Sequence, residues 1–186
     1  MMGNRGILHD DGRNIVRSWQ VRRWIACVLE FRGRRRSVMQ PHRYTELFFL
    51  DEAAAFAAGH RPCAECRRAD FNRFQALWRD CFAGRANAGD MDDRLHADRV
   101  AGKQKRTYPA EIAGLPDGTY VVAQGAAWLV FGDALYEWSD SGYTRARMRP
   151  VRGEFEVLTP RAIVDVFAAG YRVAYHPTAR RIQRSG

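Results

Sequence analysis

Cys63 and Cys66 are separated by two residues, a spacing that lets both sulfur atoms reach one metal ion. A tight turn between such residues aims both thiolates inward, and zinc accepts sulfur ligands at tetrahedral angles. Pro62 fixes the direction of the chain before the first cysteine, and neighbouring arginines favour thiolate over thiol. The pair therefore predicts a metal site, with zinc as the candidate ion.

A four-coordinate zinc site needs further ligands. Cys27 and Cys81 lie on apolar faces of a predicted strand and a predicted helix, so both are expected to be packed core thiols. His60 is so close to Cys63 in the chain that joint ligation would be strained, which leaves His42 as the candidate that can return to the site. Two alternatives stay open for the cysteine pair: a redox pair at a helix start, and reduced structural thiols.

Basic residues suggest a second kind of chemistry. The formal net charge is +9, and arginine is concentrated in residues 13–43, where Glu30 is the one acidic residue. Such a charge balance favours nucleic acid as a partner, because arginine and lysine bind backbone phosphates. A solvated sheet edge that resists aggregation is the alternative. The residues expected to bind nucleic acid are Arg32, Arg34, Arg35, Arg36, Arg43, Arg67, Arg68, Lys103, Lys105 and Arg106.

His96 and Asp98 form the most enzyme-like pair. A histidine beside a carboxylate can act as a general base, and nearby cations can hold a phosphate. The pair gives an alternative function, a phosphoester-directed hydrolase or nuclease. Another alternative is a protein-interaction module that uses Trp128, Trp138 and Tyr143 in the second half of the chain.

The elements that would position these residues follow from the hydrophobic patterning. In the first half, residues 1–13 are expected to be a flexible lead. Residues 24–31 alternate as a strand, Gly33 marks a turn, and residues 37–39 are expected to return as the second strand of a hairpin. Another strand is expected at 45–50. Asp51 is a good N-cap for a helix at 52–58, and a second helix is expected at 69–82.

Residues 83–94 are expected to be a loop, 95–100 a short helix and 102–107 an exposed basic segment. Strands are then expected at 119–122, 126–131, 134–138 and 155–158, followed by a helix from Pro160 to Gly170, a strand at 171–176 and a mobile basic tail from Thr178. The pattern predicts an α+β protein with a knuckle module (14–82), a basic linker (83–108) and a strand-rich part (109–178), packed as one globular unit.

Residues 46–67 resemble the second half of the Ada-type zinc-binding domain, in which a short strand and a helix lead into Ala-Gly-x-Arg-Pro-Cys-x-x-Cys. The resemblance implies that Cys63 and Cys66 are the second ligand pair of a zinc site beside DNA. The first pair of that family, which includes a methyl-accepting cysteine, has no counterpart here, since Arg34, Arg35 and Arg36 stand in that region. Methyl transfer is therefore not expected.

Composition limits the class of protein. No apolar run approaches the roughly 20 residues that cross a bilayer, and residues 1–13 lack the apolar stretch of a signal peptide. We therefore expect a cytoplasmic protein without a membrane partner. In that compartment the four cysteines are not expected to form structural disulfides.

Overall fold

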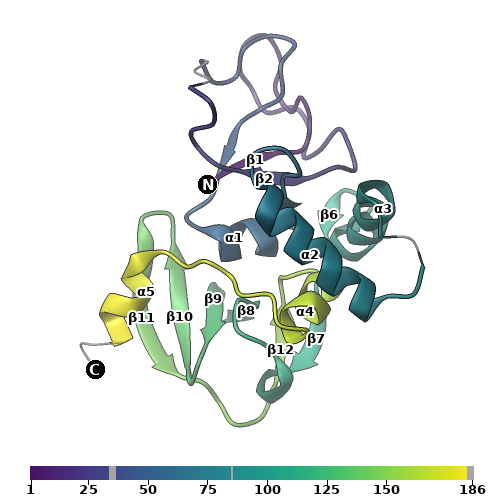
Figure 1. Cartoon of the computed structure of the whole chain (residues 1–186). Helices are drawn as coiled ribbons and strands as arrows, with labels where there is room; N and C mark the ends of the chain where they lie inside the picture. Colours follow the sequence, from purple (N-terminus) through teal and green to yellow (C-terminus); the bar gives the residue numbers. More distant parts are fainter. Residues whose placement is uncertain (34–36, 85, 184–186) are drawn as a thin grey trace.

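The computed structural model describes residues 1–33, 37–84 and 86–183, and it confirms the α+β class. Figure 1 shows a small sheet with long loops at one end of the molecule and a larger sheet at the other, with α1 and α2 between them. Arg34, Arg35 and Arg36, expected to bind nucleic acid, lie outside the described residues.

The small sheet has four short strands in the order β3-β1-β2-β4, namely β1 (Met2–Asn4), β2 (Ile25–Cys27), β3 (Leu47–Phe48) and β4 (Arg61–Pro62). β1 pairs antiparallel with both β2 and β3. β2 and β4 are parallel, with Ile25 opposite Arg61 and Ala26 opposite Pro62. Because parallel strands run in one direction, the residues that follow β2 and β4 lie at the same end of the two strands.

Three helices follow in the first half of the chain. α1 (Glu52–Ala57) begins at the predicted N-cap, since Asp51 Oδ1 accepts the Ala54 backbone N–H at 2.8 Å. α2 (Arg68–Cys81) buries Phe71, Phe74 and Trp78 along the expected stripe. α3 (Ala88–Arg99) occupies part of the segment expected to be a loop, because Met91 and Leu95 are buried one turn apart and Asn87 caps the helix.

The large sheet is antiparallel, with strand order β11-β10-β9-β8-β12-β7. A short 3-10 helix, η1 (Ile112–Gly114), follows β7. A separate hairpin is formed by β5 and β6. The strands are β5 (Val100–Ala101), β6 (Gln104–Lys105), β7 (Tyr108–Glu111), β8 (Tyr120–Ala123), β9 (Ala126–Phe131), β10 (Ala134–Ser139), β11 (Gly142–Met148) and β12 (Glu154–Val157).

One hydrophobic core joins the two halves. Helix α4 (Arg161–Ala168) has the expected position, and its Phe167 packs on Phe56 of α1 at 5.1 Å between ring centroids. The same cluster of buried side chains includes residues of α1, α2 and α3 together with residues of β8, β9 and β10.

Further segments also differ from the predictions made from the sequence. Residues 1–13 are not a free lead: they carry β1 and bury Leu8, whose N–H donates to Thr45 Oγ1. Residues 37–39 form no strand, since a turn lies at 38–39, and β2 pairs with β1 and β4 instead. Residues 171–176 form no strand, because the backbone N–H groups of Ala174 and His176 donate to carboxylates of α1 and its cap. Residues 178–183, the described part of the expected mobile tail, belong to α5 (Pro177–Gln183).

Candidate metal centre

The parallel pairing of β2 with β4 brings Cys27 to the cysteine pair. Cys27 is the last residue of β2, and Cys63 directly follows β4. The Cys63 backbone N–H donates to Ala26 O at 3.0 Å, which extends the pairing by one residue. A sequence separation of 36 residues therefore becomes direct proximity.

Cys27, Cys63 and Cys66 form one cluster, in which the three Sγ atoms lie within 4.8 Å of one another. Cys27 and Cys63 are buried and Cys66 is half-buried. The turn at 64–67 is closed by the Arg67 N–H, which donates to Cys63 O at 3.1 Å. These three residues could hold a metal ion through sulfur.

The three thiols affect one another's ionisation. The hydrogen bond from the Cys27 thiol lowers the pKa of Cys63 to about 5, although burial opposes this shift. The same hydrogen bond, with burial, raises the pKa of Cys27, and burial raises that of Cys66. The cluster thus favours one shared thiolate. Loss of the other two thiol protons would leave three thiolates that repel one another. A bound metal cation would offset this repulsion by coordinating all three sulfur atoms.

The cluster lies in the wall of a cavity of about 830 Å³. Its lining includes all three cysteines, apolar side chains such as Phe31 and Phe48, and the carboxyl residues Glu30, Glu46 and Glu65. An ion or small ligand can therefore reach the sulfur atoms from this side.

Two arginines fix the chain on either side of the cysteines. Arg61 is buried and donates from Nε and Nη2 to the two carboxylate oxygens of Asp92, at 2.9 and 2.7 Å. Arg67, expected to bind nucleic acid, is also buried, and it pairs with Glu52 and Asp70. Its guanidinium is thus engaged inside the protein rather than presented to a phosphate.

The other ligand candidates lie elsewhere. His42 is exposed in the turn at 41–43, outside the sulfur cluster. His60 is completely buried between the rings of Trp24 and Phe49. Cys81, at the end of α2, donates to Asp165 O at 3.5 Å. Cys27 was expected to be a core thiol; it is buried, but its sulfur faces the pair, a position that the apolar alternation of its strand did not reveal.

The structure does not bring His96 and Asp98 together as a catalytic pair. The His96 ring lies 4.5 Å from that of Trp19, and burial lowers the pKa of His96. Asp98 instead caps α4 by accepting the Ala162 N–H at 2.8 Å. His96 and Asp98 are two residues apart on one helix, so their side chains point in nearly opposite directions.

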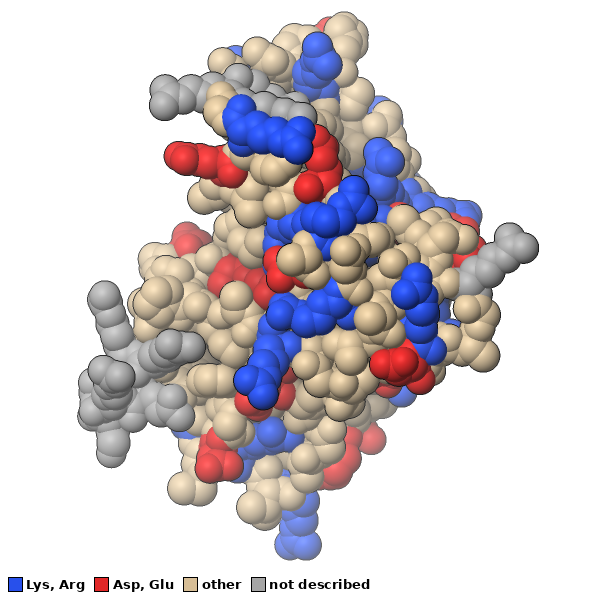
Figure 2. Space-filling model, viewed as in Figure 1, with Lys and Arg blue, Asp and Glu red and all other residues tan. Residues whose placement is uncertain are grey.

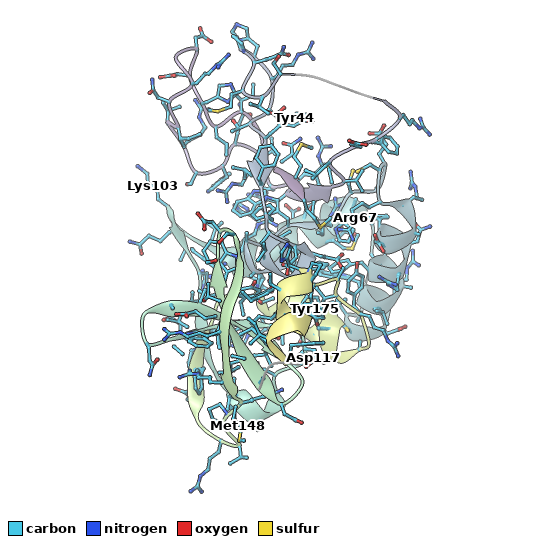
Figure 3. The ribbon with its side chains drawn as sticks, turned by 90° about the vertical axis from the view of Figure 1, so that its left-hand side faces the viewer. Tyr44, Arg67, Lys103, Asp117, Met148 and Tyr175 are labelled. Atoms are coloured by element: carbon cyan, nitrogen blue, oxygen red, sulfur yellow. The ribbon has the colours of Figure 1, made fainter. Side chains whose placement is uncertain are left out.

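The remaining basic residues of the expected nucleic-acid set are dispersed. Arg32, Arg43 and Arg68 are exposed on the first half of the chain. Lys103 and Lys105 belong to the β5–β6 hairpin, and Figure 3 shows Lys103 on the opposite side of the molecule from Arg67. Arg106 is exposed and follows the hairpin directly, and its Nε approaches Val100 O at 3.4 Å.

The aromatic residues considered for a protein-interaction surface are mostly internal. Trp128 and Tyr143 are buried in the large sheet, whereas Trp138 is 40% exposed. Among the described residues, no helix is long and apolar enough to cross a membrane. Comparison with protein-family models, with curated proteins and with solved structures finds no match for this chain.

Proposed function

We propose that this protein binds a zinc ion through Cys27, Cys63 and Cys66 and that it contacts nucleic acid. The observation that carries the zinc proposal is the gathering of three sulfur atoms within 4.8 Å. Three thiolates suit a soft or borderline cation, and zinc is the most frequent ion in tetrahedral sites of this kind.

Zinc prefers four ligands, so three cysteines would leave one position for a water molecule or another donor. The cavity beside the cluster supports access to that position. The resemblance of residues 46–67 to the Ada-type domain supports Cys63 and Cys66 as a ligand pair. In this proposal Cys27, from the preceding strand, stands in place of the upstream pair that the chain lacks.

The metal proposal is tested by the zinc content of purified protein. The wild-type chain is expected to carry about one zinc ion, and Cys27→Ser is expected to lose most of it because one of three sulfur ligands is gone. Cys81→Ser is the matched control, since Cys81 is the cysteine outside the cluster. Absence of zinc from the wild type, or equal loss in both variants, would overturn the proposal.

The positive charge of the protein supports nucleic acid as a binding partner. The formal net charge is +9, and Figure 2 shows Lys and Arg side chains across the middle of one face, over α1 and α2, with acidic residues among them. Arg32, Arg43 and Arg68, on the first half of the chain, are exposed and could contact a phosphate backbone.

Binding of DNA and RNA of mixed sequence at several salt concentrations tests this part. Binding should weaken steeply with salt, because each neutralised phosphate releases counterions. Replacing Arg32 and Arg43 together by Ala should reduce the slope of log affinity against log salt by about 2. Arg152→Ala, at an exposed site in the large-sheet half, is the control. Salt-independent or undetectable binding would exclude nucleic acid as the partner.

A further inference from the structure

We propose that Arg5, Arg99 and Lys105 form a binding site for a phosphate group, carried either by a nucleic acid backbone or by a free phosphorylated compound. The site lies where the loop before β2, the end of α1 and the β5–β6 hairpin meet. It is separate from the cysteine cluster and does not depend on the zinc proposal.

Trp24 is the centre of this cationic cluster. Its indole ring is buried, and two guanidinium groups lie against it, that of Arg99 at 4.0 Å and that of Arg5 at 4.7 Å from the ring centroid. Cations are attracted to the face of an indole ring, so Trp24 holds the two arginines in place.

Backbone carbonyl groups fix the other ends of the cluster. Arg99 Nη1 donates to Gly59 O at 2.7 Å, and Arg99 Nη2 donates to Arg22 O. The stem of Lys105 is exposed, but its Nζ turns inward and donates to Ala57 O at 2.7 Å. An ammonium group carries three protons, so two donors of Lys105 are left for another partner.

Asp92 attracts Arg99 electrostatically but forms no salt bridge with it. Both carboxylate oxygens of Asp92 are engaged by Arg61, and Asp93 pairs with Arg22. Among the residues that the structure describes, no carboxylate forms a salt bridge with Arg5, Arg99 or Lys105. Carbonyl groups carry partial charges, so they offset three full charges incompletely.

Buried donor atoms without partners mark the same place. The Nε atoms of Arg5 and Arg99 are buried and make no hydrogen bond, and neither do the two ring nitrogens of the adjacent His60. Arg99 itself is 1% exposed. Unpaired buried polar groups are rare in proteins, and an ion or water molecule commonly accounts for them.

Electrostatics agree with the geometry. Burial, followed by repulsion from Arg5 and Arg99, lowers the pKa of Lys105 to about 8. Burial also lowers the pKa of Arg99 to about 9; attraction to Asp92 opposes this shift, and repulsion from Arg61 and Arg5 adds to it. Burying these positive charges close together is energetically unfavourable, and a bound anion would offset that unfavourable free energy.

A phosphate group fits this cluster better than a carboxylate or chloride does. It carries up to two charges and several acceptor oxygens, and guanidinium and ammonium groups are the donors that bind it in proteins. Access is from the surface, where Lys105 is exposed and Arg5 is half-buried. Lys103 and Arg106, in and directly after the same hairpin, are also exposed, and Figure 3 shows Lys103 directed outward.

The competing explanation is that these cations only cap the carbonyl end of α1. The two explanations differ in whether the cluster binds an anion. Lys105→Met and Arg5→Met keep the apolar stems but remove the charge, and Arg152→Met removes one exposed charge elsewhere. Folding of each variant is checked by circular dichroism.

The experiment measures binding of inorganic phosphate and of a short oligonucleotide by calorimetry, with the ionic strength held constant by chloride. Wild type and Arg152→Met should bind at least one of the two probes with the same affinity, and Lys105→Met should weaken that binding by roughly tenfold or more. Binding of phosphate alone identifies a free phosphorylated compound as the ligand. Binding of the oligonucleotide alone identifies a nucleic acid backbone.

Three outcomes would overturn the site: no binding of either probe, equal weakening in Arg152→Met, or unchanged binding in both Lys105→Met and Arg5→Met. The zinc content of Lys105→Met is measured in parallel, and it should equal that of the wild type. A failure of the phosphate site is thereby distinguished from a failure of the zinc proposal.

Discussion

Asp92 and Asp93 are neighbours on α3 that form contrasting ion pairs. The side chains of Asp92 and Arg61 are 8% and 2% exposed, whereas those of Asp93 and Arg22 are 63% and 65% exposed. Water screens the second pair but not the first. The buried pair joins α3 to the strand that delivers Cys63, so it supports the candidate metal centre.

Replacing Asp92 by Asn should lower the free energy of unfolding by about 3–5 kcal/mol, because it leaves the Arg61 guanidinium buried without its counter-charge. Asp93→Asn should change it by less than about 1 kcal/mol. Urea unfolding of the two variants makes the comparison. Similar losses in both would mean that the Arg61–Asp92 pair is no more important than a surface pair.

His60 makes stability depend on pH. Burial, reinforced by the nearby Arg5, Arg99 and Lys105, lowers the pKa of His60 well below its ordinary value of 6.5. The folded protein therefore keeps the ring neutral at a pH where the unfolded chain takes up a proton. The resulting stability is present above pH 6.5 and is lost as the pH falls below it, by up to about 1.4 kcal/mol per pH unit.

His60→Leu should therefore show a shallower loss of stability than the wild type between pH 6.5 and 5. The matched control is His42→Leu, which removes an exposed histidine. Denaturant midpoints at several pH values give the slopes. The comparison is between slopes, so a contribution from metal release that all variants share does not affect it.

At the scale of elements, α1 and α4 end in the same way. Each ends at the first alanine of an Ala-Ala-Gly sequence, and the N–H groups of Gly59 and Gly170 donate to Phe56 O and Phe167 O at 2.8 and 2.9 Å. Both glycines have positive φ, +87° and +108°. Their surroundings differ: a Cβ on Gly59 would lie 2.6 Å from Arg99 Cδ, whereas Gly170 faces open space.

Gly170→Ala should cost roughly 1–2 kcal/mol, the strain of a left-handed alanine. Gly59→Ala should cost more than that, because the added methyl group also displaces Arg99 from its contact with Gly59 O. Thermal and urea unfolding of the two variants check the order. If Gly170→Ala were the more destabilising change, this would contradict the inference that Arg99 packs closely against Gly59.

Local patterns predicted those elements whose own sequence contains their cap and their apolar face. Asp51 predicted the start of α1, and the spacing of Phe71, Phe74 and Trp78 predicted α2. β9 was predicted at its observed bounds, Ala126–Phe131. The first half of α3 was predicted as a loop and only its end, from Leu95, as a helix, because its sequence is mostly polar and its helical form depends on Met91 and Leu95 being buried in the core.

At the scale of the whole molecule, the cap and first turn of α1 tie the two halves together. Asp51 Oδ2 accepts hydrogen bonds from Tyr143 Oη of β11 at 2.7 Å and from the His176 N–H at 2.9 Å. Glu52 accepts from Tyr171 Oη and from the Ala174 N–H. These bonds join residues 92 to 125 positions apart in the chain.

Tyr143→Phe should lower the free energy of unfolding by about 1–3 kcal/mol, because it removes a buried hydrogen bond to a carboxylate. Tyr136→Phe is a close control in the same sheet, since the buried hydroxyl of Tyr136 has no hydrogen-bond partner. That variant should be neutral or slightly stabilising. Equal destabilisation by both changes would show that the Asp51 contact contributes little.

The shared core predicts that the chain unfolds in one step. Side chains of α1 and α2 belong to the same buried cluster as those of β8 to β10, so neither half can lose its packing alone. Far-ultraviolet circular dichroism and tryptophan fluorescence should give the same urea midpoint. Trp24 and Trp128 report on the two halves, and separate midpoints would indicate two independent units.

The sequence by itself determined the cysteine pair, the α+β class, helices α1, α2 and α4 and strands such as β9, because each depends on residues a few positions apart. Tertiary structure decided the rest of the candidate site. Cys27 joins Cys63 only through the parallel pairing of β2 with β4, and the buried Arg67 pairs with Glu52 of α1 as well as with its neighbour Asp70. Such contacts depend on which distant segments bury one another, and no local spacing encodes that choice.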